Sequence, residues 1–303
     1  MGKDRGGPTG VVVVDKPKGK TSHDVVAMMR KRLSTRRVGH AGTLDPMATG
    51  VLVIMVGEAT KLGPYLTADD KRYEAEVTFG RGTDSLDADG EVVAEAPLPE
   101  WWAAEGETRL RAALEAETSR AEQKPPALSA IKVKGKSAHK RVRAGETVDL
   151  PPRPVAVRKL GLHGIDGDRA RINVDVAKGY YVRSLARDLG EALALPSHLT
   201  ALRRTASGTF LLDEALAPEM VTEERLVPLA QAAARALPTR RLTAVGVAHA
   251  QCGGPMRDGD FEEIGPEGAS AWLGPDGRLI AIGTHTQDGA AQVLRGFREP
   301  EEG

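Results

Sequence analysis

The stretch Gly39–Gly50 constrains the fold more than any other part of the chain. It reads Gly-His-Ala-Gly-Thr-Leu-Asp-Pro-Met-Ala-Thr-Gly, with three glycines and a proline in twelve residues. Such a composition disfavours a regular helix or a central strand, so the stretch predicts a turn or loop. Pro46 also pushes the backbone of Asp45 towards an extended conformation. We therefore expect an acidic side chain held on a rigid loop, just before a buried strand at Val51–Val56.

Asp45 has two interpretations. Loops held between ordered elements are common places for catalysis, and His40 and Thr43 lie close to Asp45 in the chain. The alternative is an aspartate that only caps the turn or the next helix, which is the more common situation for a lone Asp-Pro pair. Motifs elsewhere in the chain bear on this choice.

Several further segments place polar or charged side chains beside turns. They are Asp15-Lys16-Pro17, Lys71-Arg72-Tyr73, Thr83–Gly90, Pro125–Lys132, Lys178–Gly190 and Leu202-Arg203-Arg204. Position alone would make Tyr73 a core aromatic residue and Arg183 a surface arginine of a helix. Asp84, Asp87 and Asp89 are spaced rather like a calcium loop, but no glutamate follows at the right offset, so we expect no metal.

Together these segments resemble the TruB family of tRNA pseudouridine-55 synthases. That family carries a Gly-His-x-Gly-x-Leu-Asp-Pro-x-Ala-x-Gly loop, and every fixed position of it is filled at Gly39–Gly50. The resemblance implies that Asp45 is the catalytic carboxylate, that Tyr73 stacks on the target base and that Arg183 pairs with Asp45. It also implies that Tyr181 and Leu202 line the uracil pocket. We expect His40 to occupy the gap that the uridine leaves in its stack or to hold the displaced nucleotides.

The distribution of charge is more informative than its total. Lys and Arg balance Asp and Glu over the chain, yet ten basic residues face two acidic ones between Lys124 and Lys159. Clustered positive charge attracts a phosphate backbone, although a solvated basic surface without a partner is the alternative. By resemblance, a loop at about 124–152 clamps the RNA. We expect the phosphates to contact Lys132, Lys134, Lys136, Lys140, Arg141 and Arg143. His139 and Arg141 replace two aromatic residues that many relatives have, and both can still stack on bases.

The implied fold is α+β, with a mixed, mainly antiparallel central sheet and flanking helices, plus a small β-rich C-terminal module. Hydrophobic patterns predict strands over 10–15, 51–56, 71–80, 155–165 and 169–177. They also predict a helix capped by Thr21 or Ser22. Four further helices are predicted over 58–66, 109–118, 181–190 and 224–237. Short apolar runs at 244–248, 269–273, 278–282 and 291–294 suggest the β-rich module. The domains expected are a flexible leader (1–9), a pseudouridine synthase catalytic domain (10–238) and a PUA-like domain (239–303), whose acidic residues outnumber its basic ones.

The expected function is the isomerisation of one uridine to pseudouridine in the T stem-loop of tRNA, at position 55. This reaction needs no redox change or hydrolysis, and we expect no cofactor, no metal and no guide RNA. The rivals are an RNA-binding or tRNA-folding protein on the same scaffold, a guide-RNA-dependent relative, and an unrelated enzyme that uses 39–50 as a phosphate cradle. The last lacks the Gly-Lys-Ser/Thr of a nucleotide-binding loop. Cys252 is the single cysteine and no apolar run is long enough to span a bilayer, so we expect a cytoplasmic monomer without membrane attachment.

Overall fold

The computed structural model describes residues 7–68, 70–129, 131–133, 136–137, 141, 146, 148–253, 256–263, 267–285 and 290–298. Spatial contacts group the chain into two compact units. Unit 1 comprises residues 1–44, 51–69 and 208–303, and unit 2 comprises residues 45–50 and 70–207. Because these units follow contacts and not chain order, the division into 1–9, 10–238 and 239–303 stays a prediction.

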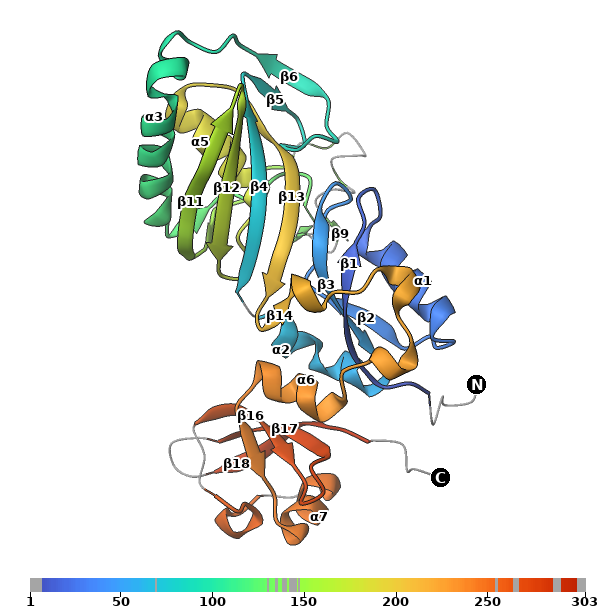
Figure 1. Ribbon diagram of the computed structural model, residues 1–303. Helices are drawn as coiled ribbons and strands as arrows, with labels where there is room; N and C mark the ends of the chain where they lie inside the picture. Colours follow the sequence, from blue (N-terminus) through green and yellow to red (C-terminus); the bar gives the residue numbers. More distant parts are fainter. Residues whose placement is uncertain are drawn as a thin grey trace. The chain divides into compact units, whose positions relative to one another are not determined.

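A mixed sheet is the core of unit 2 (Figure 1). Its antiparallel strands are, in spatial order, β13 (Ser197–Ser207), β4 (Lys71–Phe79), β12 (Arg169–Val176) and β11 (Val157–Asp166). Strand β4 pairs with both neighbours over nearly its whole length. The first two residues of β3 (Thr49–Val56) pair with β13 in parallel, Thr49 opposite Arg203 and Gly50 opposite Arg204. The predicted mixed, mainly antiparallel sheet is thus confirmed.

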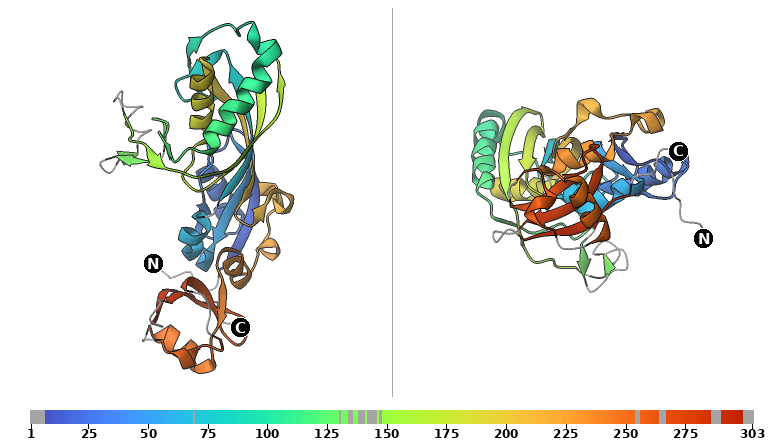
Figure 2. Two further views of the ribbon diagram at one scale, coloured as in Figure 1. Left: turned by 90° about the vertical axis from the view of Figure 1, so that its left-hand side faces the viewer. Right: turned by 90° about the horizontal axis from the view of Figure 1, so that it is seen from below.

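Two helices, α3 (Trp101–Thr118) and α5 (Val182–Leu193), pack side by side on one face of this sheet (Figures 1 and 2). The helix predicted over 109–118 was too short, because α3 already begins at Trp101. No side chain caps its N-terminus. Instead the Trp102 ring packs on Phe79 with ring centres 5.0 Å apart, and its indole N–H donates to the Gly167 carbonyl at 2.9 Å. Burial of this ring holds the first turns, and local sequence does not reveal that burial.

The described residues of unit 2 also form three short strand pairs. They are β5 (Arg81–Thr83) with β6 (Val92–Glu95), β7 (Glu122–Gln123) with β10 (Arg153–Pro154), and β8 (Lys132–Val133) with β9 (Lys136–Ser137). The pair β7–β10 joins the two ends of the predicted RNA clamp. The clamp segment is therefore tied at its base to the body of unit 2.

Gly50 makes the closest backbone approach in this part of the fold. Its φ is +97°, in the region that favours glycine, and a Cβ at this position would lie 2.2 Å from the carbonyl oxygen of Arg204. The main chain of β3 therefore reaches β13 only because residue 50 has no side chain. This contact attaches the end of the Asp45 loop to the sheet.

We expect Gly50→Ala to lower the free energy of unfolding by at least about 2 kcal/mol, since it adds both a steric clash and backbone strain. Urea unfolding followed by circular dichroism measures this. Gly161→Ala is the matched control, because Gly161 lies in β11 and a Cβ added there would meet nothing within 4 Å. Equal stability of the two variants would show that the approach of Gly50 to Arg204 is not tight.

The N-terminal part of unit 1 contains β1 (Gly10–Lys16), α1 (Ser22–Arg32), β2 (Val38–Ala41), the rest of β3, a 3-10 helix (Gly57–Leu62) and α2 (Gly63–Thr67). Thr21 caps α1 as predicted, in a reciprocal capping box with Asp24. The turn or loop predicted over 39–50 is shorter in the structure, because Gly39, His40 and Ala41 lie in β2 and Thr49 and Gly50 begin β3. Among the strands that the structure describes, β2 pairs with β3 alone, and glycine is tolerated in such an edge strand. The helix predicted over 58–66 is mostly 3-10.

The C-terminal part of unit 1 is β-rich, as predicted. The order of its sheet is β15 (Thr239–Arg241), β16 (Gly268–Leu273), β17 (Leu279–His285) and β18 (Ala291–Gly296). Helices α6 (Leu229–Ala236) and α7 (Ala244–Cys252) pack on opposite faces of it, because Ala271 and Ile282 join the core under α6, whereas Trp272 and Ala281 join the core under α7. This chain segment also forms β14 (Phe210–Leu211) and 3-10 turns at Leu212–Glu214, Pro218–Met220, Glu223–Arg225 and Asp258–Asp260.

Two predictions for this segment were wrong. The helix expected over 224–237 begins only at Leu229, because Pro228 forces Val227 to be extended, and Val227 pairs with Val11 instead. The apolar run 244–248 is helical and not a strand, because Thr243 caps it by accepting a hydrogen bond from the Gly246 N–H. Among the described residues, no helix is both long and apolar enough to cross a membrane.

Candidate active site

The structure brings Asp45 and Arg183 together, although 138 positions separate them in the chain. The Arg183 Nη2 donates to Asp45 Oδ1 at 3.2 Å, and Nε lies 2.9 Å from Oδ2. The second contact is an ion pair only, because the Nε–H is not aligned for a hydrogen bond. Arg183 is 7% exposed and Asp45 is 36% exposed. A guanidinium taken out of water thus faces a carboxylate that solvent or a substrate can reach, and the predicted pairing is confirmed.

Three groups besides Asp45 contact the Arg183 guanidinium. Its Nη1 donates to the carbonyl of Ser85 at 3.1 Å and lies 3.4 Å from Asp87 Oδ2, and Nη2 also donates to the carbonyl of Leu128 at 2.9 Å. Arg183 therefore stands between two carboxylates, those of Asp45 and Asp87. A planar guanidinium with five donors suits such a site, whereas an ammonium does not.

Asp87 is absent from the predicted site, and it is the main functional candidate revealed by the structure alone. The turn 83–90 holds it rigidly: Ser85 Oγ donates to its Oδ1 at 2.6 Å, and the Asp89 N–H donates to the same oxygen at 3.1 Å. Asp87 is 5% exposed. The sequence does not distinguish Asp87 from Asp84 and Asp89 in the same polar turn. Only its burial, which the structure reveals, sets it apart.

Tyr73 and Leu202 reach the same region through the register of the sheet. Arg204 of β13 lies opposite Tyr73 on β4 and opposite Gly50 on β3, so the end of the Asp45 loop and Tyr73 flank one residue. Leu202 lies opposite Ala75, two positions along β4. Leu202 is buried, whereas Tyr73 is only half-buried. Tyr73 is therefore not the fully enclosed core aromatic of the alternative interpretation.

Tyr181 lies at the N-cap of α5, two residues before Arg183. Burial raises the pKa of its hydroxyl, and the Asp45 carboxylate raises this pKa further, whereas the guanidinium groups of Arg153 and Arg183 lower it. The raised pKa keeps the Tyr181 phenol protonated at neutral pH.

A buried polar network anchors α5 against α3. The Tyr180 hydroxyl donates to Glu117 Oε1 at 2.9 Å, and Arg120 pairs with the other oxygen of Glu117. Burial raises the pKa of both Glu117 and Tyr180. Asp188 pairs with Arg187 on the same helix at 2.6 Å and lies 3.8 Å from Arg120.

The structure describes the other predicted contact residues only in part. His40 is in unit 1, half-buried, with its ring edge-on to His23 at 5.5 Å between centres. Arg141 pairs with Glu146 at 2.6 Å. For Lys132 and Lys136 only the backbone, in β8 and β9, is described, and Lys134, Lys140 and Arg143 lie outside the described residues. Within the described ranges, no three His, Cys, Asp or Glu side chains meet in a way that could hold a metal ion.

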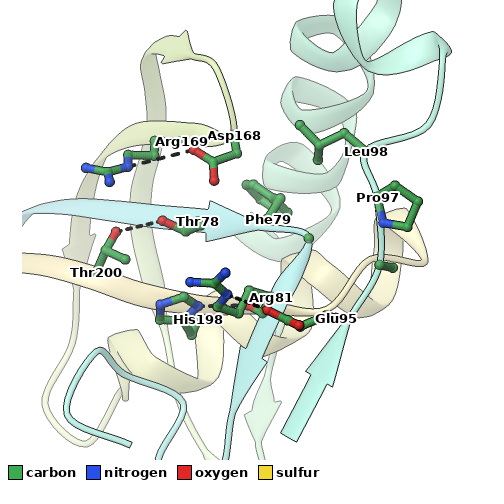
Figure 3. A pocket seen from close by; sticks show the side chains of 12 residues that line it. Thr78, Phe79, Arg81, Glu95, Pro97, Leu98, Asp168, Arg169, His198 and Thr200 are labelled. Atoms are coloured by element: carbon green, nitrogen blue, oxygen red, sulfur yellow. Dashed lines mark hydrogen bonds and ion pairs between the residues drawn. The ribbon is translucent and has the colours of Figure 1, made fainter. Parts of the chain in front are cut away.

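Unit 2 also has a pocket of about 580 Å³ that contains none of the predicted site residues (Figure 3). It lies at the other end of β4, where Thr78 is five residues, or roughly 17 Å, from Tyr73. Its arginines are already paired, Arg81 with Glu95 at 2.9 Å and Arg169 with Asp168 at 3.8 Å. Asp45 and Arg183 are not among the residues that line this pocket, so the pocket and the Asp45–Arg183 pair are separate features of unit 2.

Comparison with known proteins identifies the family. Residues 30–182 match the family described as TruB family pseudouridylate synthase (N terminal domain), and residues 183–242 match the tRNA pseudouridylate synthase B C-terminal domain. The chain belongs to the TruB family of pseudouridine synthases. Members of this family are isomerases, so the predicted enzyme class is confirmed.

Individual relatives of this TruB-family protein agree over most of its length. The tRNA pseudouridine synthase B of Thermobifida fusca is 45% identical over 297 residues, which cover 94% of this chain and 97% of that protein. The protein of the same name from Arthrobacter sp. is 42% identical over 285 residues, covering 90% and 92%. Among solved structures, a Cbf5-Nop10-Gar1 complex matches with a TM-score of 0.73 at 24% identity, over 99% of this chain and 92% of that chain. This last likeness supports the fold alone.

Proposed function

We propose that this TruB-family protein isomerises the uridine at position 55 in the T-loop of tRNA to pseudouridine, without a cofactor or a guide RNA, as a cytoplasmic monomer. The observation that carries the proposal is the Asp45 carboxylate, partly exposed and held by the buried guanidinium of Arg183. The names of the close relatives supply the tRNA substrate. The proposed isomerisation involves neither a redox change nor hydrolysis, so it needs no redox cofactor.

The proposed chemistry breaks the N-glycosidic bond, turns the uracil and joins its C5 to the sugar, after which the C5 proton is lost. Asp45 acts in its ionised form, and a guanidinium partner favours that form. Asp45 attacks the sugar, adds to the base or removes a sugar proton, and each of these routes uses the ionised carboxylate. Tyr73 stacks on the uracil and assists removal of the C5 proton, while Tyr181 and Leu202 hold the detached base.

The uridine must leave its stack to reach Asp45, because a base within a folded loop is not accessible. In the proposal, His40 holds the displaced nucleotides, and Lys132, Lys134, Lys136, Lys140, Arg141 and Arg143 bind phosphates of the T stem-loop. Leu128, at the start of the clamp segment, contacts Arg183 directly through its carbonyl oxygen. This contact supports a clamp that works beside the catalytic cluster.

The test is incubation of the purified protein with an unmodified tRNA transcript and nothing else. We expect pseudouridine at position 55, and none in a transcript with cytidine at that position. Binding without modification would favour the RNA-binding or tRNA-folding alternative. Modification that appears only when a second RNA is added would favour a guide-dependent enzyme.

The clamp proposal predicts a steep dependence of tRNA affinity on salt. The logarithm of the association constant falls by about 0.7 to 0.9 per logarithmic unit of salt for each phosphate neutralised. We expect Lys134→Ala/Lys136→Ala/Lys140→Ala to flatten this slope in filter-binding titrations. The control is Arg109→Ala/Arg111→Ala, which removes exposed α3 arginines that already pair with Glu105 and Glu107. An unchanged slope in the triple variant would move the binding surface elsewhere.

A further inference from the structure

Gln123 is a buried glutamine, 1% exposed, whose carboxamide binds both backbone groups of one residue. Its Oε1 accepts a hydrogen bond from the Tyr181 N–H at 2.9 Å, and its Nε2 donates to the Tyr181 carbonyl at 3.2 Å. A neighbouring β-strand normally provides such a pair of bonds, whereas a single side chain provides it to Tyr181. Only one orientation of the amide satisfies both bonds, so the side chain has a defined donor and a defined acceptor.

The bound residue lies at the start of the helix that carries the site. Tyr181 is the N-cap of α5, its backbone is extended, and its own side chain does not cap the helix. Its carbonyl also accepts the first helical hydrogen bond, from the Leu185 N–H at 3.1 Å. Fixing the Tyr181 backbone therefore fixes the origin of two side chains, the Tyr181 phenol and the Arg183 guanidinium.

Gln123 is itself held in place by the sheet and by its neighbour. It pairs with Arg153 in the β7–β10 ladder, and the next carbonyl, that of Lys124, accepts bonds from Ser184 Oγ at 2.9 Å and Arg187 Nη2 at 3.1 Å. Ser184 and Arg187 lie within α5, whereas Gln123 binds the residue that precedes it. Gln123 thus determines where the helix begins, and the Lys124 carbonyl holds its first turns.

We infer that Gln123 is a positioning residue for the isomerisation. Its carboxamide sets the backbone of Tyr181, and with it the start of α5, so that Arg183 meets Asp45. The kinetic test of this inference rests on the proposed function. The structural test of the Tyr181 backbone position does not depend on that function. Gln123 touches neither Asp45 nor the uridine in this scheme and acts only through Tyr181 and α5.

The kinetic test measures single-turnover rate constants at saturating tRNA, together with dissociation constants. Misplacing reacting groups by about 1 Å costs on the order of 100-fold in rate, so we expect Gln123→Ala to lower the rate constant about 10- to 100-fold. The dissociation constant should change less than about threefold, because Gln123 is buried and meets no phosphate. Glu122→Gln is the matched control, since it changes the exposed neighbour on the same strand and should react at nearly the wild-type rate.

Gln123→Glu separates positioning from a general loss of stability. A protonated glutamic acid has one O–H donor and one carbonyl acceptor, as the amide does, whereas the ionised form cannot donate to the Tyr181 carbonyl. The ratio of the Gln123→Glu rate to the wild-type rate should therefore rise as pH falls. The wild-type profile measured over the same pH range is the reference for groups that both proteins share. A flat ratio, or a Gln123→Ala rate like that of Glu122→Gln, would overturn the inference.

A crystal structure of Gln123→Ala decides the matter even without activity. Displacement of the Tyr181 backbone and loss of the Arg183–Asp45 contact would support the inference. Unchanged positions of both would overturn it. Failure of the wild-type protein to modify tRNA would instead count against the proposed function, and this structure would still test the role of Gln123.

Discussion

Asp45→Asn should abolish pseudouridine formation while tRNA still binds. The substitution keeps the shape of the side chain and its hydrogen bond from Arg183, but it removes the negative charge on which every proposed route depends. We expect a loss of at least ~10³-fold in the single-turnover rate, measured by tritium release from [5-³H]uridine-labelled tRNA. The dissociation constant should stay within a few-fold of the wild-type value, because a carboxylate contributes no attraction to phosphates.

Asp166→Asn is the matched control for this variant. Asp166 is exposed at the end of β11, directly before the turn to β12, and Asn-Gly is a favourable turn sequence, so its activity should be unchanged. Near-normal turnover by Asp45→Asn would show that the chemistry lies elsewhere. A large loss of tRNA affinity would show that Asp45 contributes to binding or to the fold of the loop.

The second large effect is expected at Arg183, where both charge and fork geometry matter. Arg183→Lys keeps the charge but cannot reach Asp45, Asp87 and the carbonyls of Ser85 and Leu128 together, so we expect it to retain a little activity. Arg183→Met should retain almost none, because two carboxylates then face each other without the cation between them. Single-turnover rates and dissociation constants measured side by side give the comparison.

Arg111→Lys on α3 is a suitable control, because Arg111 is exposed and pairs only with Glu107 among the contacts described. It should change neither rate nor affinity. The tRNA affinity of the Arg183 variants separates two roles, because a residue that only holds Asp45 affects the rate far more than the binding of RNA. Affinity lost in proportion to rate would reassign Arg183 to substrate binding.

Residue types and spacing predicted the loop that carries Asp45 and the strands and helices around it, whereas the roles of Asp45, Tyr73, Tyr181 and Leu202 came from the family resemblance. The glycines and Pro46 of the 39–50 stretch require an irregular backbone, and Asp45 follows directly from that loop. The alternation of polar and apolar residues over 71–80 predicted strand β4, with Tyr73 on its apolar face. The Lys-Gly-Tyr-Tyr sequence predicted a turn followed by helix α5. The pairing of Arg183 with Asp45 came from family resemblance alone, because two positions so far apart carry no local sign of contact.

Local sequence determined the elements whose stability comes from neighbouring residues: the capping box of α1, the buried strand at 51–56 and the loop that presents Asp45. Only the tertiary structure decided where buried polar groups find partners. In the sequence, Asp87 is one of three acids in a polar turn, and in the fold it lies beside Arg183. Gln123 has no distinguishing sequence feature, yet in the fold both polar atoms of its amide bond the Tyr181 backbone. A hydrogen bond or ion pair between distant segments forms because the fold removes both groups from water, and that removal leaves no periodic pattern along the chain.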